Sequence, residues 1–262
     1  MLFDSHCHLN DDKLYPIAAD IVDDALRNGV LRMICIGYDP QANRRALEIA
    51  DRFPSVYAAL GFHPEIAHEV KPEDWGELEN MLRHPKAVAV GECGLDYYWD
   101  KTHVETQKAV FRKQLDLASR IGKPVVVHMR EATGDTLDIL SERPSGSLSG
   151  VMHCYSGSVE SLRSFLDLGL FISLAGPVTF KNARLPKEVA AVIPGNRLLI
   201  ETDSPYLSPV PFRGKDNVPG HLPAIALEVA RLRGMGIEDL SRMISGNASR
   251  LFGVPLPDEN TF

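Results

Sequence analysis

The sequence contains little cysteine: four residues in 262, with no Cys-x-x-Cys pair among them. That absence argues against zinc-ribbon and thioredoxin-like sites, and four scattered cysteines are typical of reduced, buried thiols. The N-terminus lacks a basic segment followed by an apolar stretch, so no signal peptide is expected. No run of about 18 apolar residues occurs either, which argues against a transmembrane helix. We therefore expect a cytoplasmic protein that does not enter a membrane.

Positive charge is also in deficit, because 28 Lys and Arg face 35 Asp and Glu and the formal net charge is −7. A protein that binds a long stretch of DNA needs a basic surface, so the acidic balance argues against an architectural DNA-binding role. An enzyme that acts on nucleic acid at one local site is not excluded. The 44% of hydrophobic residues is typical of a globular protein. Residues 1–262 suit one α/β barrel, which needs about 250 residues, and we expect a single domain and a monomer.

Eight short apolar runs, rich in β-branched residues, recur along the chain. They are Leu2–His8, Arg32–Gly37, Val56–His63, Ala87–Glu92, Pro124–Arg130, Gly150–Tyr155, Phe171–Ala175 and Leu198–Asp203. Most are almost continuously apolar, which is typical of parallel strands that are covered on both faces. Helical patterns lie between them and end at glycines such as Gly29 and Gly122. Eight βα units in one domain predict a (βα)8 TIM barrel, with a doubly wound open sheet as the alternative.

Polar side chains stand at the carboxyl ends of these apolar runs, which meet at one mouth of a parallel barrel. They are His6, His8, His63, Glu92, His128, His153, Glu201 and Asp203. Because side chains alternate along a strand, His6 and His8 share one side and Cys7 points to the helix layer. The same alternation turns Cys93 and Cys154 outward. It also places Glu201 one layer below Asp203.

Four imidazoles and two carboxylates at one mouth are typical of a metal site, and mixed nitrogen and oxygen ligands suit Zn²⁺, Mn²⁺ or Mg²⁺. The expected ligands are His6, His8, Glu92, His128, His153 and Asp203. Six ligands are too many for one tetrahedral ion. We therefore expect two divalent ions about 3.5–4 Å apart that activate a water molecule. Asp203 can take the proton of that water. His63 either acts in catalysis or only lines the mouth, and we expect the other four histidines, His68, His84, His103 and His221, at the surface.

Five motifs, spread from residue 3 to residue 252, resemble the TatD family of metal-dependent deoxyribonucleases. They are 3–8 (FDSHCH), 91–98 (GECGLDYY), 153–157 (HCYSG), 201–207 (ETDSPYL) and 247–252 (NASRLF). The resemblance implies a barrel in which Glu92 bridges two ions. It implies His6, His8, Glu92 and Asp203 as the ligands of one ion, and Glu92, His128 and His153 as those of the other. His63 and Glu201 match active-site positions of the family.

Three residues depart from the family pattern: Phe212 stands where His is common, Val218 where Glu is common, and Met129 where a small residue is frequent. None is an expected ligand, so these departures bear on the natural substrate and not on metal binding. Arg130 and Arg213 are candidate phosphate contacts, although Arg213 can equally be a solvated charge on a proline-stiffened loop. Aromatic residues 97–99 either stack on exposed bases or pack their loop against the next helix.

Three functions remain open. The first is a two-metal phosphodiester hydrolase that acts on DNA ends or single-stranded DNA. The second is a carboxylic ester or amide hydrolase, such as an aminoacyl-ester deacylase, and the third is a binding protein without catalysis. Glu92 stands where many amidohydrolases carry a modified lysine, which favours the first. Two divalent ions would focus positive potential at the mouth of an otherwise acidic molecule, so we expect a short contact with a strand end.

Overall fold

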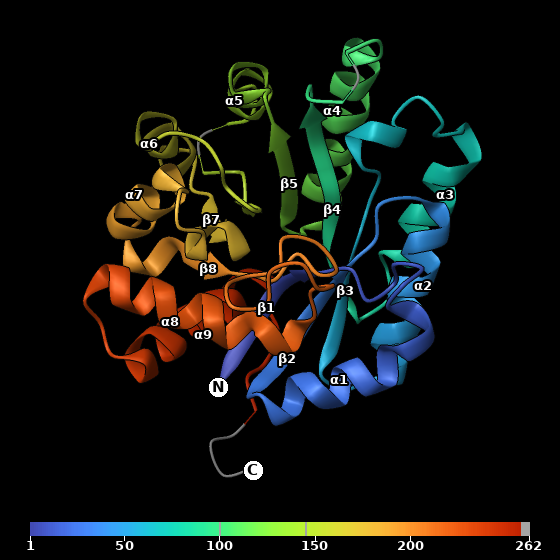
Figure 1. Cartoon of the computed structure of the whole chain (residues 1–262). Helices are drawn as coiled ribbons and strands as arrows, with labels where there is room; N and C mark the ends of the chain where they lie inside the picture. Colours follow the sequence, from blue (N-terminus) through green and yellow to red (C-terminus); the bar gives the residue numbers. More distant parts are fainter. Residues whose placement is uncertain (100, 145, 258–262) are drawn as a thin grey trace.

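The computed structural model describes residues 1–99, 101–144 and 146–257, and it contains eight strands surrounded by helices (Figure 1). The strands are β1 (Leu2–Cys7), β2 (Val30–Ile36), β3 (Val56–Leu60), β4 (Ala87–Asp96), β5 (Val125–Arg130), β6 (Gly150–Met152), β7 (Phe171–Leu174) and β8 (Leu198–Ile200). The helices are α1 (Ala18–Arg27), α2 (Pro40–Arg52), α3 (Pro72–Met81), α4 (Val104–Ile121), α5 (Thr133–Ser141), α6 (Val159–Asp167), α7 (Arg184–Val192), α8 (Leu222–Arg233) and α9 (Ile237–Phe252). In the described ranges, no helix is both long and apolar enough to cross a membrane.

The strands form one sheet in which each strand pairs in parallel with the next, in the order β1 to β8. The main chain just beyond β8 returns to β1: the Asp203 N–H donates to the His6 carbonyl at 2.9 Å, and the His8 N–H donates to the Ser204 carbonyl at 2.7 Å. A doubly wound sheet would show a reversal of strand order, and none is present in this sheet. The (βα)8 barrel prediction is therefore confirmed.

Apolar side chains form one core on each side of the barrel wall. The inner core fills the barrel with strand side chains such as Phe3, Val126 and Leu199, together with Phe252 from the end of α9. Since Phe3 lies at the start of β1 and its ring centroid is 6.2 Å from that of Phe252, α9 closes the amino end of the barrel. The outer core lies between strands and helices. In the described part of the chain, the carboxyl end of the barrel is left open for a site.

A register shift in β4, between Val90 and Cys93, changes which side chains face the barrel interior. Ala89 belongs to the inner core, whereas Cys93 and Leu95 belong to the outer core. The extra residue of this bulge lets Glu92 turn inward although its position differs in parity from Ala89. Gly91 makes the bulge possible, because it has φ +143° and a Cβ there would lie 2.6 Å from the Val126 carbonyl oxygen.

Helix ends agree with the sequence analysis better than strand ends do. The helices α1 and α4 end just before Gly29 and Gly122, which have φ values of +78° and +68°. In contrast, β4 continues four residues beyond its expected end at Glu92. Strands β3, β6 and β8 stop before His63, His153 and Asp203, so these side chains lie on the loops that follow.

The outward orientation expected for Cys154 is wrong. Cys154 is partly exposed and lines the cavity at the barrel mouth. Strand alternation ends at Met152, and Cys154 itself has φ +42°, in the left-handed region. Alternation applies only within an extended strand, so it does not hold at this position. Cys7 and Cys93, which lie within strands, are buried in the outer core as expected.

Candidate metal centre

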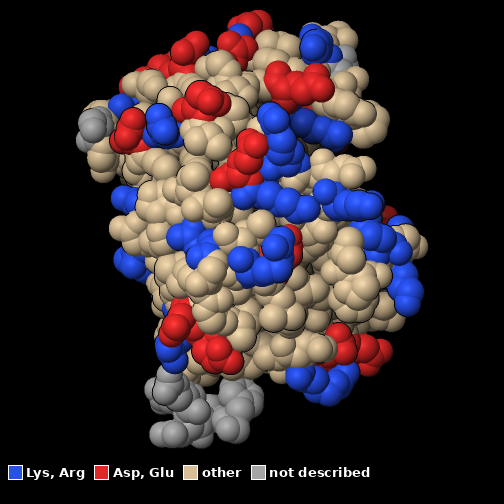
Figure 2. All heavy atoms as spheres, turned by 60° about the vertical axis from the view of Figure 1, so that its left-hand side comes forward, with Lys and Arg blue, Asp and Glu red and all other residues tan. Residues whose placement is uncertain are grey.

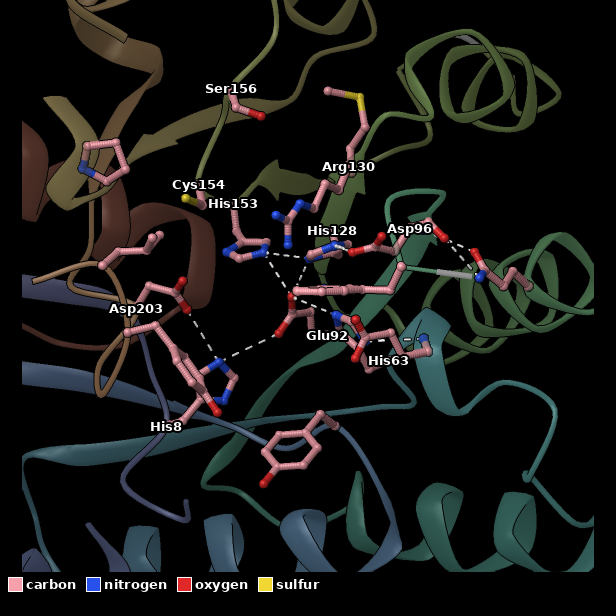
Figure 3. A pocket seen from close by; sticks show the side chains of 18 of the residues that line it. His8, His63, Glu92, Asp96, His128, Arg130, His153, Cys154, Ser156 and Asp203 are labelled. Carbon is pink, nitrogen blue, oxygen red and sulfur yellow. Dashed lines mark hydrogen bonds and ion pairs between the residues drawn. The ribbon is translucent and has the colours of Figure 1, made fainter. Parts of the chain in front are cut away.

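A cavity of about 940 Å³ opens at the carboxyl end of the barrel, at the upper end of the size range of ligand pockets. Most residues expected at the site line it: His8, His63, Glu92, His128, Arg130, His153 and Asp203. His6 and Glu201 lie beneath them and are fully buried. In Figure 3, Glu92 occupies the centre, with His8 and Asp203 on one side and His63 and His128 on the other.

Four donor atoms form a first cluster: His6 Nε2, His8 Nε2, Glu92 Oε2 and Asp203 Oδ1. The two nitrogens lie 3.1 Å apart. Asp203 Oδ1 lies 3.5 Å from His6 Nε2 and 3.4 Å from His8 Nε2, and Glu92 Oε2 lies 3.4 and 3.7 Å from the same two atoms. A tetrahedral ion with bonds of about 2.0–2.2 Å keeps its ligands about 3.3–3.6 Å apart, and these five separations are close to that range. His6, His8 and Asp203 form a group that could hold one ion, with Glu92 beside it.

The other carboxylate oxygen of Glu92 faces a second cluster. Glu92 Oε1 lies 2.8 Å from His128 Nδ1 and 2.8 Å from His153 Nε2, and the two nitrogens are 3.1 Å apart. Glu92 therefore points one oxygen at each cluster, which is the arrangement required of a carboxylate that bridges two ions.

Three imidazole rings also have a hydrogen-bond partner on the side that faces away from the clusters. His8 Nδ1 donates to the Ile36 carbonyl at 3.1 Å, since a carbonyl oxygen only accepts. His153 Nδ1 and Glu201 Oε1 lie 3.1 Å apart, and His128 Nε2 and Asp96 Oδ2 lie 2.9 Å apart. When the outer nitrogen of such a ring carries the hydrogen, the nitrogen that faces the cluster presents a lone pair, as in metal-binding imidazoles.

The imidazole nitrogens and carboxylate oxygens of the two clusters are suited to bind cations. A bare nitrogen lone pair and a carboxylate oxygen at 2.8 Å repel each other unless positive charge lies between them. Burial raises the pKa of Glu92, but the surrounding imidazoles of His153 and His6 outweigh it and hold that pKa well below its usual range. Burial lowers the pKa of His153, but Glu92 and Glu201 outweigh it and raise that pKa well above its usual range. Both pKa shifts mean that positive charge next to Glu92 is favourable.

His63 differs from these three rings. Its Nδ1 accepts the Glu65 N–H at 3.2 Å, so the neutral ring carries its hydrogen on Nε2, 3.6 Å from Glu92 Oε1. Burial and the neighbouring His128 lower the pKa of His63 to about 3, so the ring is neutral. Although His63, Glu92 and His128 form a group that could hold an ion, an Nε2–H suits a donor to substrate or water better than a ligand.

Asp96 is a site residue that the sequence analysis did not assign. It is buried, lines the cavity and binds His128 Nε2, and its other oxygen accepts the Tyr98 N–H at 2.9 Å. The signal was present in the alternation of Glu92 and Asp96 on one strand. We expected this strand to end at Glu92, but β4 continues to Asp96, and Gly91 and Gly94 permit its close packing on β5.

The two candidate phosphate contacts, Arg130 and Arg213, differ in their position relative to the cavity. Arg130 lines the cavity, with its guanidinium carbon 3.7 Å from the centre of the Tyr98 ring. Arg213 lies outside the cavity lining, where it donates to the Ser208 carbonyl at 2.9 Å and stacks over Phe180 at 4.1 Å. A substrate contact of Arg213 would need a strand that extends beyond the cavity. Of the departures from the family pattern, Met129 lines the cavity.

Two histidines expected at the solvated surface lie at the rim of the cavity. His68 is exposed as expected and His103 is half-buried; both line the cavity and stack face to face, with ring centroids 4.3 Å apart and planes 6° apart. The sequence did not predict this contact, because the two histidines lie on the separate loops that follow β3 and β4. His84 forms an ion pair with Asp51, outside the cavity lining. His221 stacks on Phe212 with centroids 3.7 Å apart, also outside the lining.

Comparisons with known proteins agree with this geometry. A family model described as TatD related DNase matches residues 3–253. The Bacillus subtilis (strain 168) protein named uncharacterized metal-dependent hydrolase YabD is 41% identical over 254 residues, which cover 97% of this chain and 100% of that protein. A 3'-5' ssDNA/RNA exonuclease TatD of Edwardsiella piscicida is 37% identical over 238 residues, 88% of this chain and 92% of that protein. The crystal structure of YJJV, a TatD homologue from Escherichia coli K12, has a TM-score of 0.92 and 29% identity, covering 97% of this chain and 98% of that one.

Proposed function

The chain belongs to the TatD family of metal-dependent hydrolases, and on that premise we propose that it hydrolyses phosphodiester bonds at DNA ends or in single-stranded DNA. The observation that carries the proposal is the position of Glu92, with one oxygen at each of two nitrogen-rich clusters. Paired divalent sites of this kind serve in-line displacement at phosphorus. The name of the Edwardsiella relative, an exonuclease on single-stranded DNA and RNA, supports the same substrate class.

Two divalent ions are proposed as cofactors. His6, His8, Glu92 and Asp203 would hold one, and Glu92, His128 and His153 would hold the other. When bound, such ions would lower the pKa of a water molecule and stabilise negative charge on the phosphoryl oxygens. The nitrogen and oxygen donors suit Zn²⁺ or Mn²⁺, and the carboxylates also admit Mg²⁺.

The residues of the chain supply the proton transfers and the orientation. Burial raises the pKa of Asp203, but the neighbouring imidazoles of His8 and His6 outweigh it, so the net pKa is lowered and the carboxylate is ionised. An ionised Asp203 can accept the proton of the attacking water. His63 offers its Nε2–H to a phosphoryl oxygen. Glu201, which binds His153 Nδ1, keeps that ring in the orientation needed for a ligand.

Charge at the mouth suits a phosphate despite the acidic composition. Two divalent ions would cancel more than half of the net charge of −7, and all of this positive charge would lie inside the cavity. Arg130 adds a planar cation at its wall. The outer surface is also uneven: Figure 2 shows Lys and Arg side chains gathered in a band across the middle of one face. These features support a short contact with one strand.

Cleavage assays test the proposal directly. The metal-loaded protein is incubated with 5′- and 3′-labelled single-stranded and duplex oligonucleotides and, separately, with an aminoacyl ester. We expect cleavage of the single strand, and loss of that cleavage in Glu92→Ala and Asp203→Ala. Cleavage that survives either substitution would contradict the mechanism. Turnover of the ester without cleavage of any oligonucleotide would favour the ester or amide hydrolase instead.

The compartment and assembly state are part of the same proposal. All four cysteines are free thiols, the state expected in the reducing cytoplasm. The six expected ligands come from one chain and meet within one barrel, so no second copy is needed to complete the site. We propose a cytoplasmic monomer, and size-exclusion chromatography with light scattering tests the monomer directly.

A further inference from the structure

The loop after β4 holds an exposed tryptophan at the mouth of the cavity. Trp99 is 67% exposed and lines the cavity. Its neighbour Tyr97 is bound into the fold, because the hydroxyl donates to Asp135 of α5 at 2.7 Å. This contact with α5 accounts for Tyr97, whereas most of the Trp99 ring remains in solvent. Large aromatic side chains left exposed beside a pocket mark contact surfaces.

Arg130 connects Trp99 to the metal centre. Its guanidinium carbon lies 3.7 Å from the centre of the Tyr98 ring and 5.4 Å from that of Trp99. In Figure 3, the side chain of Arg130 extends toward His153 and His128. A phosphate held by Arg130 would lie between the metal clusters and Trp99, so the base of the adjoining nucleotide would be within reach of the Trp99 ring.

A stacked pair of histidines also lies at the cavity. His68 and His103 stack in parallel at 4.3 Å and also line the cavity. We call Trp99, His68 and His103 the aromatic rim. Ring faces along a strand path bind successive bases without regard to sequence, because every base has a π-face.

We propose that Trp99 stacks on an unpaired nucleobase next to the scissile phosphate, and that the aromatic rim thereby selects single strands over duplex. This inference rests on the proposed phosphodiesterase function. The physical reason is access: the faces of bases within a duplex are covered by neighbouring bases, and exposing them costs unstacking energy. A single strand or a frayed end offers its base faces at little cost.

Binding is tested by fluorescence. The chain has two tryptophans, and Trp75 is held against Phe62 with ring centroids 5.2 Å apart, so Trp75→Phe leaves Trp99 as the one tryptophan. We expect saturable quenching with a phosphorothioate-linked single-stranded oligonucleotide, and little with a blunt duplex of equal length. The control ligand is an abasic strand of the same length, which should not quench. Equal quenching by the abasic strand would overturn the proposal, because backbone contacts alone would then explain binding.

Kinetics separate the inference from the function on which it rests. Trp99→Ala should raise KM for single-stranded oligonucleotides by about 5- to 100-fold, with kcat and metal affinity little changed, and Trp99→Phe should restore most of the loss. The preference for single strands over duplex should shrink in the alanine variant. An unchanged KM and an unchanged preference would overturn the role of Trp99 while leaving the nuclease function intact. Failure of the wild-type protein to cleave any oligonucleotide would instead contradict the proposed function.

Discussion

Glu201 fixes the orientation of His153 from beneath the site. Its Oε1 lies 3.1 Å from His153 Nδ1 and accepts the Cys154 N–H at 2.7 Å. Both contacts are made by a carboxylate that is fully buried. With Nδ1 engaged, His153 Nε2 faces Glu92 Oε1 at 2.8 Å. Glu201 can therefore control how well His153 serves as a ligand.

Removal of Glu201 should weaken metal binding without removing a ligand. We expect Glu201→Ala to lower the affinity of the second ion by about 10- to 100-fold, and Glu201→Gln to lower it less, because an amide oxygen can still accept the Nδ1–H. Titration calorimetry on the apo protein measures both constants. Glu188→Gln, which changes an exposed carboxylate on α7, is the matched control. Equal affinities in the Glu201 variants and the control would show that Glu201 does not position His153.

Glu92 should contribute to the gain in the free energy of unfolding that each of the two ions provides. Saturation of one site at about 100 times its Kd should add about 2.7 kcal/mol to the free energy of unfolding of the apo protein. Glu92→Gln should reduce this gain at both sites, whereas His153→Ala should reduce it at the second site alone. Urea unfolding with and without Mn²⁺ or Zn²⁺ measures the gain. Two full-affinity ions in Glu92→Gln would contradict the bridging role.

The barrel and most of the site were predictable because they depend on local patterns. A parallel strand that is buried on both faces is almost continuously apolar, so a polar residue at its end, such as Glu92 or His128, stands out. Helix ends were predictable for a similar reason, since Gly122 with positive φ follows directly in the chain. Both signals lie within a few residues of the feature that they predict.

The features that the sequence did not predict depend on contacts between segments that are far apart in the chain. The bulge before Cys93 and the extension of β4 to Asp96 require close packing against β5, which the sequence of β4 alone does not reveal. The orientation of Cys154 depends on where β6 stops pairing with β7. His68 and His103 meet only because two loops lie together at the mouth. Alternation rules assume an unbroken strand, so they fail at these positions.

Gly94 should be far less tolerant of substitution than a helical glycine. It has φ +144°, and a Cβ at this position would overlap the carbonyl oxygen of His128. We expect Gly94→Ala to lower the free energy of unfolding by about 3 kcal/mol or more, because backbone strain and overpacking add. Gly134→Ala on α5 is the matched control: its Cβ would meet nothing within 4 Å, and it should stabilise by about 0.5–1 kcal/mol. Similar unfolding energies for the two variants would contradict the close approach of β4 and β5.

The four cysteines should differ sharply in reactivity. Cys7, Cys35 and Cys93 are buried, whereas Cys154 is partly exposed at the cavity. An aromatic disulfide reagent should modify one thiol per native chain and four in urea. Burial raises the pKa of Cys154 well above its usual range, so its reaction should be slower than that of a free thiol. Native Cys154→Ala should not react with the reagent, and a reactive thiol in that variant would contradict the buried positions of the other three cysteines.

Arg130 should contribute to phosphate binding and not to metal binding. Its guanidinium is held against Tyr98 and faces the cavity, where it can pair with two phosphate oxygens. Loss of a hydrogen bond to a charged group costs about 1.5–3 kcal/mol, so Arg130→Ala should lower kcat/KM for an oligonucleotide by about 10- to 150-fold. Arg130→Lys should recover part of this loss, because a lysine keeps the charge but not the planar pair of donors.

Inorganic phosphate provides an independent measurement of the same contact. Its inhibition constant should rise in Arg130→Ala in proportion to the loss in kcat/KM, while the stoichiometry and affinity of the ions stay at the wild-type values. Arg231→Ala, which removes an exposed arginine paired with Glu228 on α8, controls for the change in net charge. Arg213→Ala should matter only for oligonucleotides long enough to pass beyond the cavity. If Arg130→Ala lowered ion affinity as much as it lowered phosphate affinity, Arg130 would be supporting the metal centre and would not be a direct contact of the substrate.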